Sequence, residues 1–406
     1  MKTIISIIKV YVMNLITICL NLFIWRDKKV WLFGAWMGDK FSDNPRFLFQ
    51  YLCENKDKYN IKKVIWVTRN KDVHETLKKL GYEVYLINSF YGIFYHLKAG
   101  VHLVCNNVSF AGYEYDINSY LSFGAKKIQL WHGVGIKACG KLTRKDSEHR
   151  TFGQWISDIF LSRHGQPGGW GNSYFFATSK ENARVAVDDY NAKKENIIIS
   201  VYPRLLHCVG LLSNEKEVIN QLRELKGKRK KIILYLPTFR KNDAEFINPY
   251  DIEGFGEFIM HNSIIWVQKE HSASNKSDND LENANVIVLN KDFDVNVLYD
   301  EIDLMITDYS SASSDCIYKR VKTLEYCPDY NDYVSNDRGF VSEFSNYHVG
   351  EPVVEAKELF NEITKIFNSA EEYGVKEKKV RSFLYDDQEK DYNDIMTDIM
   401  GKIVGL

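Results

Sequence analysis

The chain has 406 residues, of which 45% are hydrophobic and 26% are charged. This balance is typical of a globular protein of roughly two to three domains, and it excludes a disordered chain, a collagen-like fibre and a polytopic membrane protein. Because 53 Lys and Arg oppose 54 Asp and Glu, the net charge is -1, which predicts no partnership with nucleic acid.

The seven cysteines are odd in number and scattered, without a C-x-x-C pair. Their spacing predicts neither a disulfide framework nor a zinc site, and it suits a reducing cytoplasm. The sequence also has no P-loop, dinucleotide fingerprint, H-E-x-x-H or nucleophile elbow, each of which would point to a known chemistry. We therefore expect no metal and no organic cofactor.

The N-terminus carries a strongly apolar stretch, with 17 apolar residues among the 22 at positions 4–25. On a helical projection its polar residues fall within an arc of about 140 degrees, which predicts an amphipathic helix at a membrane surface. Residues 1–29 would bind that surface, their basic side chains meeting anionic headgroups. A single span with its final basic residues in the cytoplasm and a helix buried against its own protein are the alternatives.

Short apolar runs separated by amphipathic stretches follow, which is typical of parallel strands with crossover helices. The first series lies at 30–34, 64–68, 84–87, 101–105 and 128–131, and the second at 232–238, 263–269, 286–289, 304–307 and 323–326. The highly charged stretch 211–231 favours a boundary at or just before it. We expect a membrane helix at 1–27, α/β domains at 28–208 and 209–375, and a C-terminal helix at 376–406 packing back on them.

In two-domain α/β enzymes, ligands bind beyond the carboxyl ends of the strands. His132, Gly133 and Lys137 follow one predicted strand. His132 is the leading candidate for a general base, since its ordinary pKa leaves a neutral acceptor nitrogen near pH 7. A structural role for His132 and a solvated surface position for Lys137 are the alternatives.

Residues suited to bind phosphate follow the second series of strands. Lys269 and His271 could clamp a pyrophosphate or belong to a polar loop. The hydroxyls after Thr307-Asp308 could bind a phosphate or merely cap a helix. Arg204 and Arg240 could each take phosphate oxygens or instead pair with an acid.

Six motifs occur in one order along the chain: SDNP at 42–45, LWHGVGIK at 130–137, YPR at 202–204, LPTFR at 236–240, KEH at 269–271 and TDYSSASSD at 307–315. Together they resemble the CDP-glycerol glycerophosphotransferase family, whose members build teichoic acids and related capsule polymers. The corresponding family motifs are SDNP, LWHGTPLK, G-x-P-R, PT[WF]R, K-x-H and TDYSS followed by an Asp. The chain departs from them at Val134-Gly135, Tyr202 and Glu270-His271-Ser272.

The resemblance implies an α/β fold of the GT-B type, with two Rossmann-like doubly wound domains facing a cleft and the donor held mainly by the C-terminal one. It also implies transfer of a polyol phosphate, glycerol phosphate first and ribitol phosphate second, from a CDP-activated donor to a hydroxyl of a lipid-linked or polymer acceptor, with release of CMP. The reaction would take place at the cytoplasmic face of a bacterial cell membrane.

On this resemblance, His132 is the base and His271 assists the leaving phosphate. The implied donor-binding residues are Arg204, Arg240, Lys269, His271, Thr307, Asp308, Ser310, Ser311 and Asp315, although Asp308 and Asp315 would rather order the loop. The implied acceptor-side residues are Asp43, Asn44, Gly133 and Lys137.

Two other classes of function stay open: a GT-B glycosyltransferase that uses a nucleotide sugar, and an inactive nucleotide-binding subunit of an assembly complex. The stretch 143–171 matches no motif. It is either an acceptor-side loop facing the membrane or an ordinary connecting helix and turn.

Overall fold

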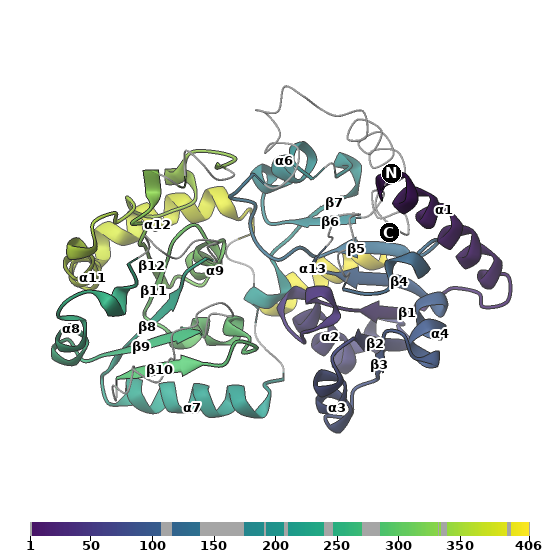
Figure 1. The fold of residues 1–406 in the computed structure, drawn as a ribbon, viewed down its shortest axis with the longest axis horizontal. Coiled ribbons are helices and arrows are strands. Elements are labelled where there is room, and N and C mark those ends of the chain that lie inside the picture. The colour runs from purple at the N-terminus through teal and green to yellow at the C-terminus, as the bar shows by residue number, and fades with distance from the viewer. Residues whose placement is uncertain are drawn as a thin grey trace. The chain divides into compact units, whose positions relative to one another are not determined.

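The structure is a computed structural model that describes residues 2–106, 116–138, 174–190, 192–206, 210–238, 247–269, 285–331, 333, 339–387 and 391–405. The chain forms two compact units, each built on a parallel β-sheet (Figure 1). Unit 1 comprises Met1–His132, Gly140–Gly210 and Glu389–Leu406, and unit 2 comprises Gly133–Cys139 and Leu211–Gln388. Arg240, His271 and the stretch 143–171 therefore lie outside the described residues.

The sheet of unit 1 has seven strands in the order β3-β2-β1-β4-β5-β6-β7. All neighbouring strands are parallel. The strands are β1 (Asp27–Phe33), β2 (Lys63–Thr68), β3 (Val84–Leu86), β4 (Ala99–Val104), β5 (Lys126–Gln129), β6 (Tyr174–Ala177) and β7 (Ile197–Ile199). The strand order reverses between β1 and β4, where the carboxyl ends of a doubly wound sheet open a crevice for ligands.

Helices in unit 1 begin at side chains that cap them. Asn70 accepts backbone N–H bonds at the start of α3 (Lys71–Lys79), as Ser89 does for α4 (Phe90–Lys98) and Ser179 for α6 (Lys180–Asp188). These short polar side chains satisfy N–H groups that lack a partner within the helix. Unit 1 also contains α2 (Asp43–Asn55) and the C-terminal α13 (Tyr392–Val404).

The sheet of unit 2 has five parallel strands in the order β10-β9-β8-β11-β12. They are β8 (Lys231–Leu236), β9 (Ile264–Lys269), β10 (Val286–Leu289), β11 (Leu304–Thr307) and β12 (Lys322–Glu325). Its helices are α7 (Ser213–Gly227), α8 (Phe255–His261), α9 (Ala312–Tyr318), α11 (Leu359–Asn368) and α12 (Ala370–Leu384). The strand order reverses between β8 and β11, so the second crevice lies beyond their carboxyl ends.

The N-terminal helix α1 (Lys2–Asn21) packs against α4 and the short 3₁₀ helix η3 (Ser119–Leu121) of unit 1 (Figure 1). Thr17 is buried and its Oγ1 donates to the carbonyl of Tyr120 at 3.0 Å. The Lys9 ammonium lies 4.9 Å from the centre of the Tyr120 ring. Among the described residues, no helix has the length and hydropathy to span a membrane.

The predicted α/β fold with two parallel sheets is confirmed, and all ten predicted strands are present. The structure adds β6 and β7 to the first sheet. The compact units also divide the chain differently from the expected domain boundaries, since Gly133–Cys139 belongs to unit 2 and α13 to unit 1.

Candidate active site

His132 lies just beyond β5 in unit 1, and its ring is held by a backbone group. The imidazole Nδ1 is 2.9 Å from the carbonyl oxygen of Cys105, which follows β4. Because a carbonyl oxygen only accepts, Nδ1 carries the proton and the lone pair is on Nε2. Burial is the main cause that lowers the pKa of His132, with the Cys105 bond and Asp43 acting in the opposite direction. His132 is therefore neutral near pH 7, with Nε2 ready to accept a proton.

Two indole rings flank His132. The ring centroids of Trp131 and Trp36 lie 4.5 and 5.8 Å from that of the imidazole. Trp36 is 37% exposed, so a bound molecule could contact its ring. The sequence motifs do not include Trp36, and only its position just after a predicted strand could have drawn attention to it.

Asp43 and Arg204 form a buried ion pair that orders this region. Arg204 Nη1 lies 2.5 Å from Asp43 Oδ1, and both side chains are almost fully buried. The second carboxylate oxygen of Asp43 accepts from Trp36 Nε1 at 3.1 Å. The guanidinium of Arg204 thus pairs with an acid inside unit 1, the alternative that the sequence left open, and its contact with donor phosphates stays a prediction.

Asn44 joins three segments of unit 1. Its Nδ2 donates to the carbonyls of Leu130 and Trp131 at 3.3 and 2.8 Å, and its Oδ1 accepts from the backbone N–H of Arg204 at 3.2 Å. Like Asp43, Asn44 is buried. Both expected acceptor-side residues therefore belong to the unit that carries His132, where they hold its loops in place, and their role toward the acceptor stays a prediction.

The backbone around His132 is strained. Among the described residues, eight non-glycine residues have positive φ, and four of them surround His132: Trp36 (46°), Met37 (58°), Asp43 (64°) and Trp131 (56°). Such conformations cost about 1 to 3 kcal/mol each and persist where surrounding contacts enforce them, which is common at functional sites. The ion pair and the Asn44 bonds supply contacts of that kind.

In unit 2, Asp308 joins the ends of β8 and β11. Its carboxylate accepts from the N–H and Oγ1 of Thr238 and from the N–H of Tyr309, at 2.6 to 3.1 Å. Thr307 is buried, and its Oγ1 donates to the carbonyl of Leu236 at 2.5 Å. The Thr307 hydroxyl therefore lies between strands, and its contact with the donor stays a prediction.

The serines that follow are more accessible. Ser310 and Ser311 are half-buried, and Ser310 Oγ accepts from the N–H of Ala312 at 3.3 Å. Asp315 is buried within α9, and its contact with the donor stays a prediction. Of the residues predicted in this motif, the two serine hydroxyls are those that a ligand could reach.

Lys269, at the end of β9, donates from Nζ to the carbonyl of Phe293 at 2.7 Å. The amine therefore lies over the carboxyl edge of the second sheet, as the sequence predicted. Its predicted partners Arg240 and His271 lie outside the described residues.

Lys137 and Gly133 belong to unit 2, and their role on the acceptor side stays a prediction. Lys137 forms an isolated antiparallel β-bridge. Beside it, the N–H of Ala138 donates to the carbonyl of Gly339 at 3.2 Å. The Lys137 ammonium lies 5.9 and 5.4 Å from the ring centres of Tyr309 and Tyr333. Lys137 therefore adds a cation beside the segment that carries Ser310 and Ser311.

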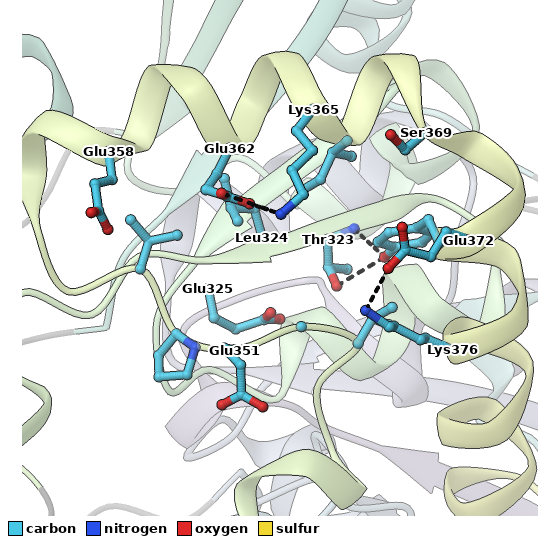
Figure 2. Close-up of a pocket in the computed structure, with 16 residues that line it drawn as sticks. Thr323, Leu324, Glu325, Glu351, Glu358, Glu362, Lys365, Ser369, Glu372 and Lys376 are labelled. Atoms are coloured by element: carbon cyan, nitrogen blue, oxygen red, sulfur yellow. Dashed lines mark hydrogen bonds and ion pairs between the residues drawn. The ribbon is translucent and has the colours of Figure 1, made fainter.

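A cavity of about 310 Å³ lies at the outer edge of β12, between α11, α12 and the segment 349–353 (Figure 2). Its described lining has five glutamates against two lysines, and it includes none of the predicted site residues. An acidic lining repels a diphosphate, so this cavity does not suit a nucleotide donor. No group of three His, Cys, Asp or Glu side chains in the described part of the chain is arranged to hold a metal ion.

Comparison with known proteins gives one consistent result. The family described as CDP-Glycerol:Poly(glycerophosphate) glycerophosphotransferase matches residues 15–397. A teichoic acid poly(glycerol phosphate) polymerase of Bacillus spizizenii is 27% identical over 375 residues, which cover 84% of this chain and 85% of that protein. A teichoic acid glycerol-phosphate transferase of Staphylococcus aureus is 23% identical over 363 residues, 86% of each chain.

Among solved structures, the wall teichoic acid polymerase TagF has the same fold, with a TM-score of 0.70 at 18% identity over 99% of this chain and 98% of that chain. The family match extends over nearly the whole chain and includes both units. The chain therefore belongs to the CDP-glycerol:poly(glycerophosphate) glycerophosphotransferase family.

Proposed function

We propose that this enzyme transfers glycerol phosphate from CDP-glycerol to a hydroxyl of a lipid-linked or polymer acceptor in the synthesis of a teichoic-acid-type polymer. The acceptor oxygen attacks the β-phosphorus of the donor and forms a new P–O bond. The bond between that phosphorus and the bridging oxygen breaks, and CMP leaves with the electron pair. The proton of the acceptor hydroxyl passes to Nε2 of His132.

The observation that carries this proposal is the fixed tautomer of His132. A general base must present a lone pair and be unprotonated at the working pH, and the Cys105 carbonyl together with the lowered pKa meets both conditions. The strained loops and the buried Asp43–Arg204 pair keep the imidazole in one orientation. Preorganisation of this kind lowers the cost of reaching the transition state.

Unit 2 supplies the proposed donor site. Negative charge builds up on the pyrophosphate as CMP leaves, so cations and hydroxyl donors there stabilise the transition state. Lys269, Ser310 and Ser311 lie at the carboxyl edge of the second sheet, and Asp308 orders the loop between them. From the motif resemblance we assign Arg240 and His271 to the same site, with His271 assisting the leaving phosphate.

We also propose that α1 binds the cytoplasmic face of the membrane. Thr17 and Lys9 face unit 1, whereas the large apolar side chains on the rest of the helix and just after it are exposed. These are Ile8, Tyr11, Val12, Leu15, Ile16, Ile18, Leu20, Leu22, Phe23 and Trp25. A polar face turned to the protein and an apolar face turned away is the reverse of an ordinary surface helix, and it suits burial in the acyl boundary.

CMP release tests the reaction directly. The detergent-solubilised full chain is given CDP-glycerol, CDP-ribitol, or a panel of UDP and GDP sugars, each with and without a lipid-linked acceptor. The proposal predicts acceptor-dependent CMP from CDP-glycerol. Release of UDP or GDP, with no CMP from either polyol donor, would assign the enzyme to nucleotide-sugar chemistry and overturn the proposal.

A further inference from the structure

Asp116 is a buried carboxylate close to His132 that no sequence motif includes. It is 1% exposed and accepts three backbone N–H bonds. Met37 donates to Oδ1 at 2.8 Å, and Cys105 and Asn106 donate to Oδ2 at 2.9 and 2.7 Å. One of these three N–H groups, that of Asn106, belongs to the peptide group whose carbonyl oxygen binds the His132 imidazole.

That peptide group joins Cys105 to Asn106. Its N–H, on Asn106, donates to Asp116 Oδ2, and its C=O, on Cys105, accepts from His132 Nδ1–H at 2.9 Å. Because resonance couples the two ends of an amide, a carboxylate on the N–H makes the carbonyl oxygen a stronger acceptor. Bonds that share a peptide group in a low-dielectric site polarise one another in this way.

We infer that Asp116 is a positioning residue that acts on His132 through the Cys105–Asn106 peptide group. It fixes the tautomer with the proton on Nδ1, and it stabilises the imidazolium that forms when Nε2 takes the acceptor proton. Asp116 thus has the role of the aspartate in a Ser-His-Asp triad, except that a peptide group lies between its carboxylate and the imidazole ring. This inference rests on the proposed role of His132 as the base.

A purely structural role for Asp116 is the competing explanation, since the Met37 bond also ties the loop after β1 to the end of β4. The charge of Asp116 separates the two explanations. Burial raises the pKa of Asp116 to about 7 despite its three N–H bonds. Its charge, and with it the polarisation of the peptide group, is therefore lost as the pH falls through neutrality.

The other ionisable groups beside this hydrogen-bond network behave differently from Asp116 over the same pH range. Burial, Asp116 and Asp43 keep the pKa of the Cys105 thiol well above its ordinary value, so the thiol stays neutral. Asp43 and Arg204 face His132 and pair with each other, and Arg69 donates to the carbonyl of Met37 on the neighbouring loop. We expect two ionisations on the acid limb of the rate, one near pH 7 from Asp116 and one below pH 6.5 from His132.

The test is acceptor-dependent CMP release by the full chain with Asp116→Asn across pH 5.5 to 8.5. Loss of the outer hydrogen-bond partner that orients a metal-bound histidine typically costs about 10- to 100-fold, and we take the same range for this imidazole. We expect a fall of that size in kcat with the KM for CDP-glycerol unchanged, and the ionisation near pH 7 absent. Asp189→Asn, which alters another buried carboxylate of unit 1 at the end of α6, should change neither the rate nor the pH profile.

A folded Asp116→Asn variant with unchanged kcat, or with both ionisations retained, overturns the inference. If the variant does not fold, ¹⁵N-histidine NMR of the wild type decides, with the His132 signals assigned by comparison with His132→Gln. The inference predicts Nδ1 protonated and Nε2 bare, with a step in their shifts near pH 7, and the absence of that step contradicts it. Wild-type CMP release is measured first, so failure of the proposed function is seen separately.

Discussion

Asp43 and Arg204 are 161 residues apart in sequence and form an ion pair of 2.5 Å that is almost completely buried in unit 1. Asp43 begins α2, and Arg204 lies in the short turn after β7. The pair also receives the indole N–H of Trp36. The ion pair therefore joins three loops that surround His132. Two of the sequence motifs thus stabilise the same region of unit 1.

Arg204→Met should destabilise unit 1 strongly. Removing one partner of a buried ion pair leaves the other charge uncompensated, which typically costs about 3 to 5 kcal/mol. Urea denaturation measures the loss, and the double variant with Asp43→Asn should recover part of it. The control is Arg184→Met, whose pairs with Glu181 and Asp188 are exposed on α6 and contribute less than about 1 kcal/mol.

The same variants decide between two roles for Arg204. A phosphate-binding arginine would leave the unfolding free energy unchanged and raise the KM for the donor. The buried pair predicts the opposite: a large loss of stability, with the donor KM unaffected wherever the protein is folded.

Acid should weaken unit 1 through its buried histidines. Burial lowers the pKa of His96 to about 4, and it holds the pKa of His102 well below the ordinary value. Between pH 6.5 and 4 each of these imidazoles binds a proton in the unfolded chain that it does not bind in the folded chain, so each contributes a loss of stability as the pH falls, whereas Asp116, whose pKa is raised to about 7, contributes in the opposite direction. For His96 alone the loss is about 2 kcal/mol by pH 5. Urea midpoints at pH 7.5 and 5 measure it, and His96→Gln should reduce the difference.

The strands could be predicted because each is a buried apolar run with a helix between it and the next, and that pattern survives in any parallel sheet. The runs at β6 and β7 were not predicted, although with four and three residues they are as long as β5 and β3, which were. The placement of Lys137 in unit 2 could not be predicted either, because a chain can cross between units at any residue and nothing local marks the crossing.

The candidate site could be predicted only in part. His132 was found because it follows a strand and lies in a motif. The partners of His132 were not, since the bond to Cys105 and the carboxylate of Asp116 depend on how loops from different strands pack. Asp116 belongs to none of the six motifs. An arginine that pairs with Asp43 also looks, in sequence, the same as one that binds phosphate.

Lys137→Met should raise the KM for CDP-glycerol about tenfold and leave the KM for the acceptor unchanged. The reason is that the Lys137 ammonium lies beside Tyr309 in unit 2, where a cation attracts a diphosphate. Initial rates of CMP release at varied donor and acceptor give both constants. Lys376→Met, an exposed lysine on α12, is the matched control. A rise in the acceptor KM alone would return Lys137 to the acceptor side.

Membrane binding should depend on the apolar face of α1. The double variant Leu15→Glu and Phe23→Glu replaces side chains that are 61% and 87% exposed, and we expect vesicle affinity to fall about tenfold or more. Cosedimentation with vesicles containing phosphatidylglycerol measures it. Val375→Glu, at an equally exposed apolar position on α12 of unit 2, should bind like the wild type. Equal binding by both variants would show that α1 is not the anchor.

The most direct test of the account is His132→Gln, with donor binding and turnover measured separately. Loss of a general base typically costs about 10²- to 10⁴-fold, so acceptor-dependent CMP release should fall by that factor. Binding of CDP-glycerol, followed by calorimetry, should change less than twofold, because we propose that unit 2 holds the donor. His74→Gln, which alters a half-buried histidine of α3 beside Glu75, should keep full activity. Wild-type turnover by the folded His132→Gln protein would show that His132 is not the general base.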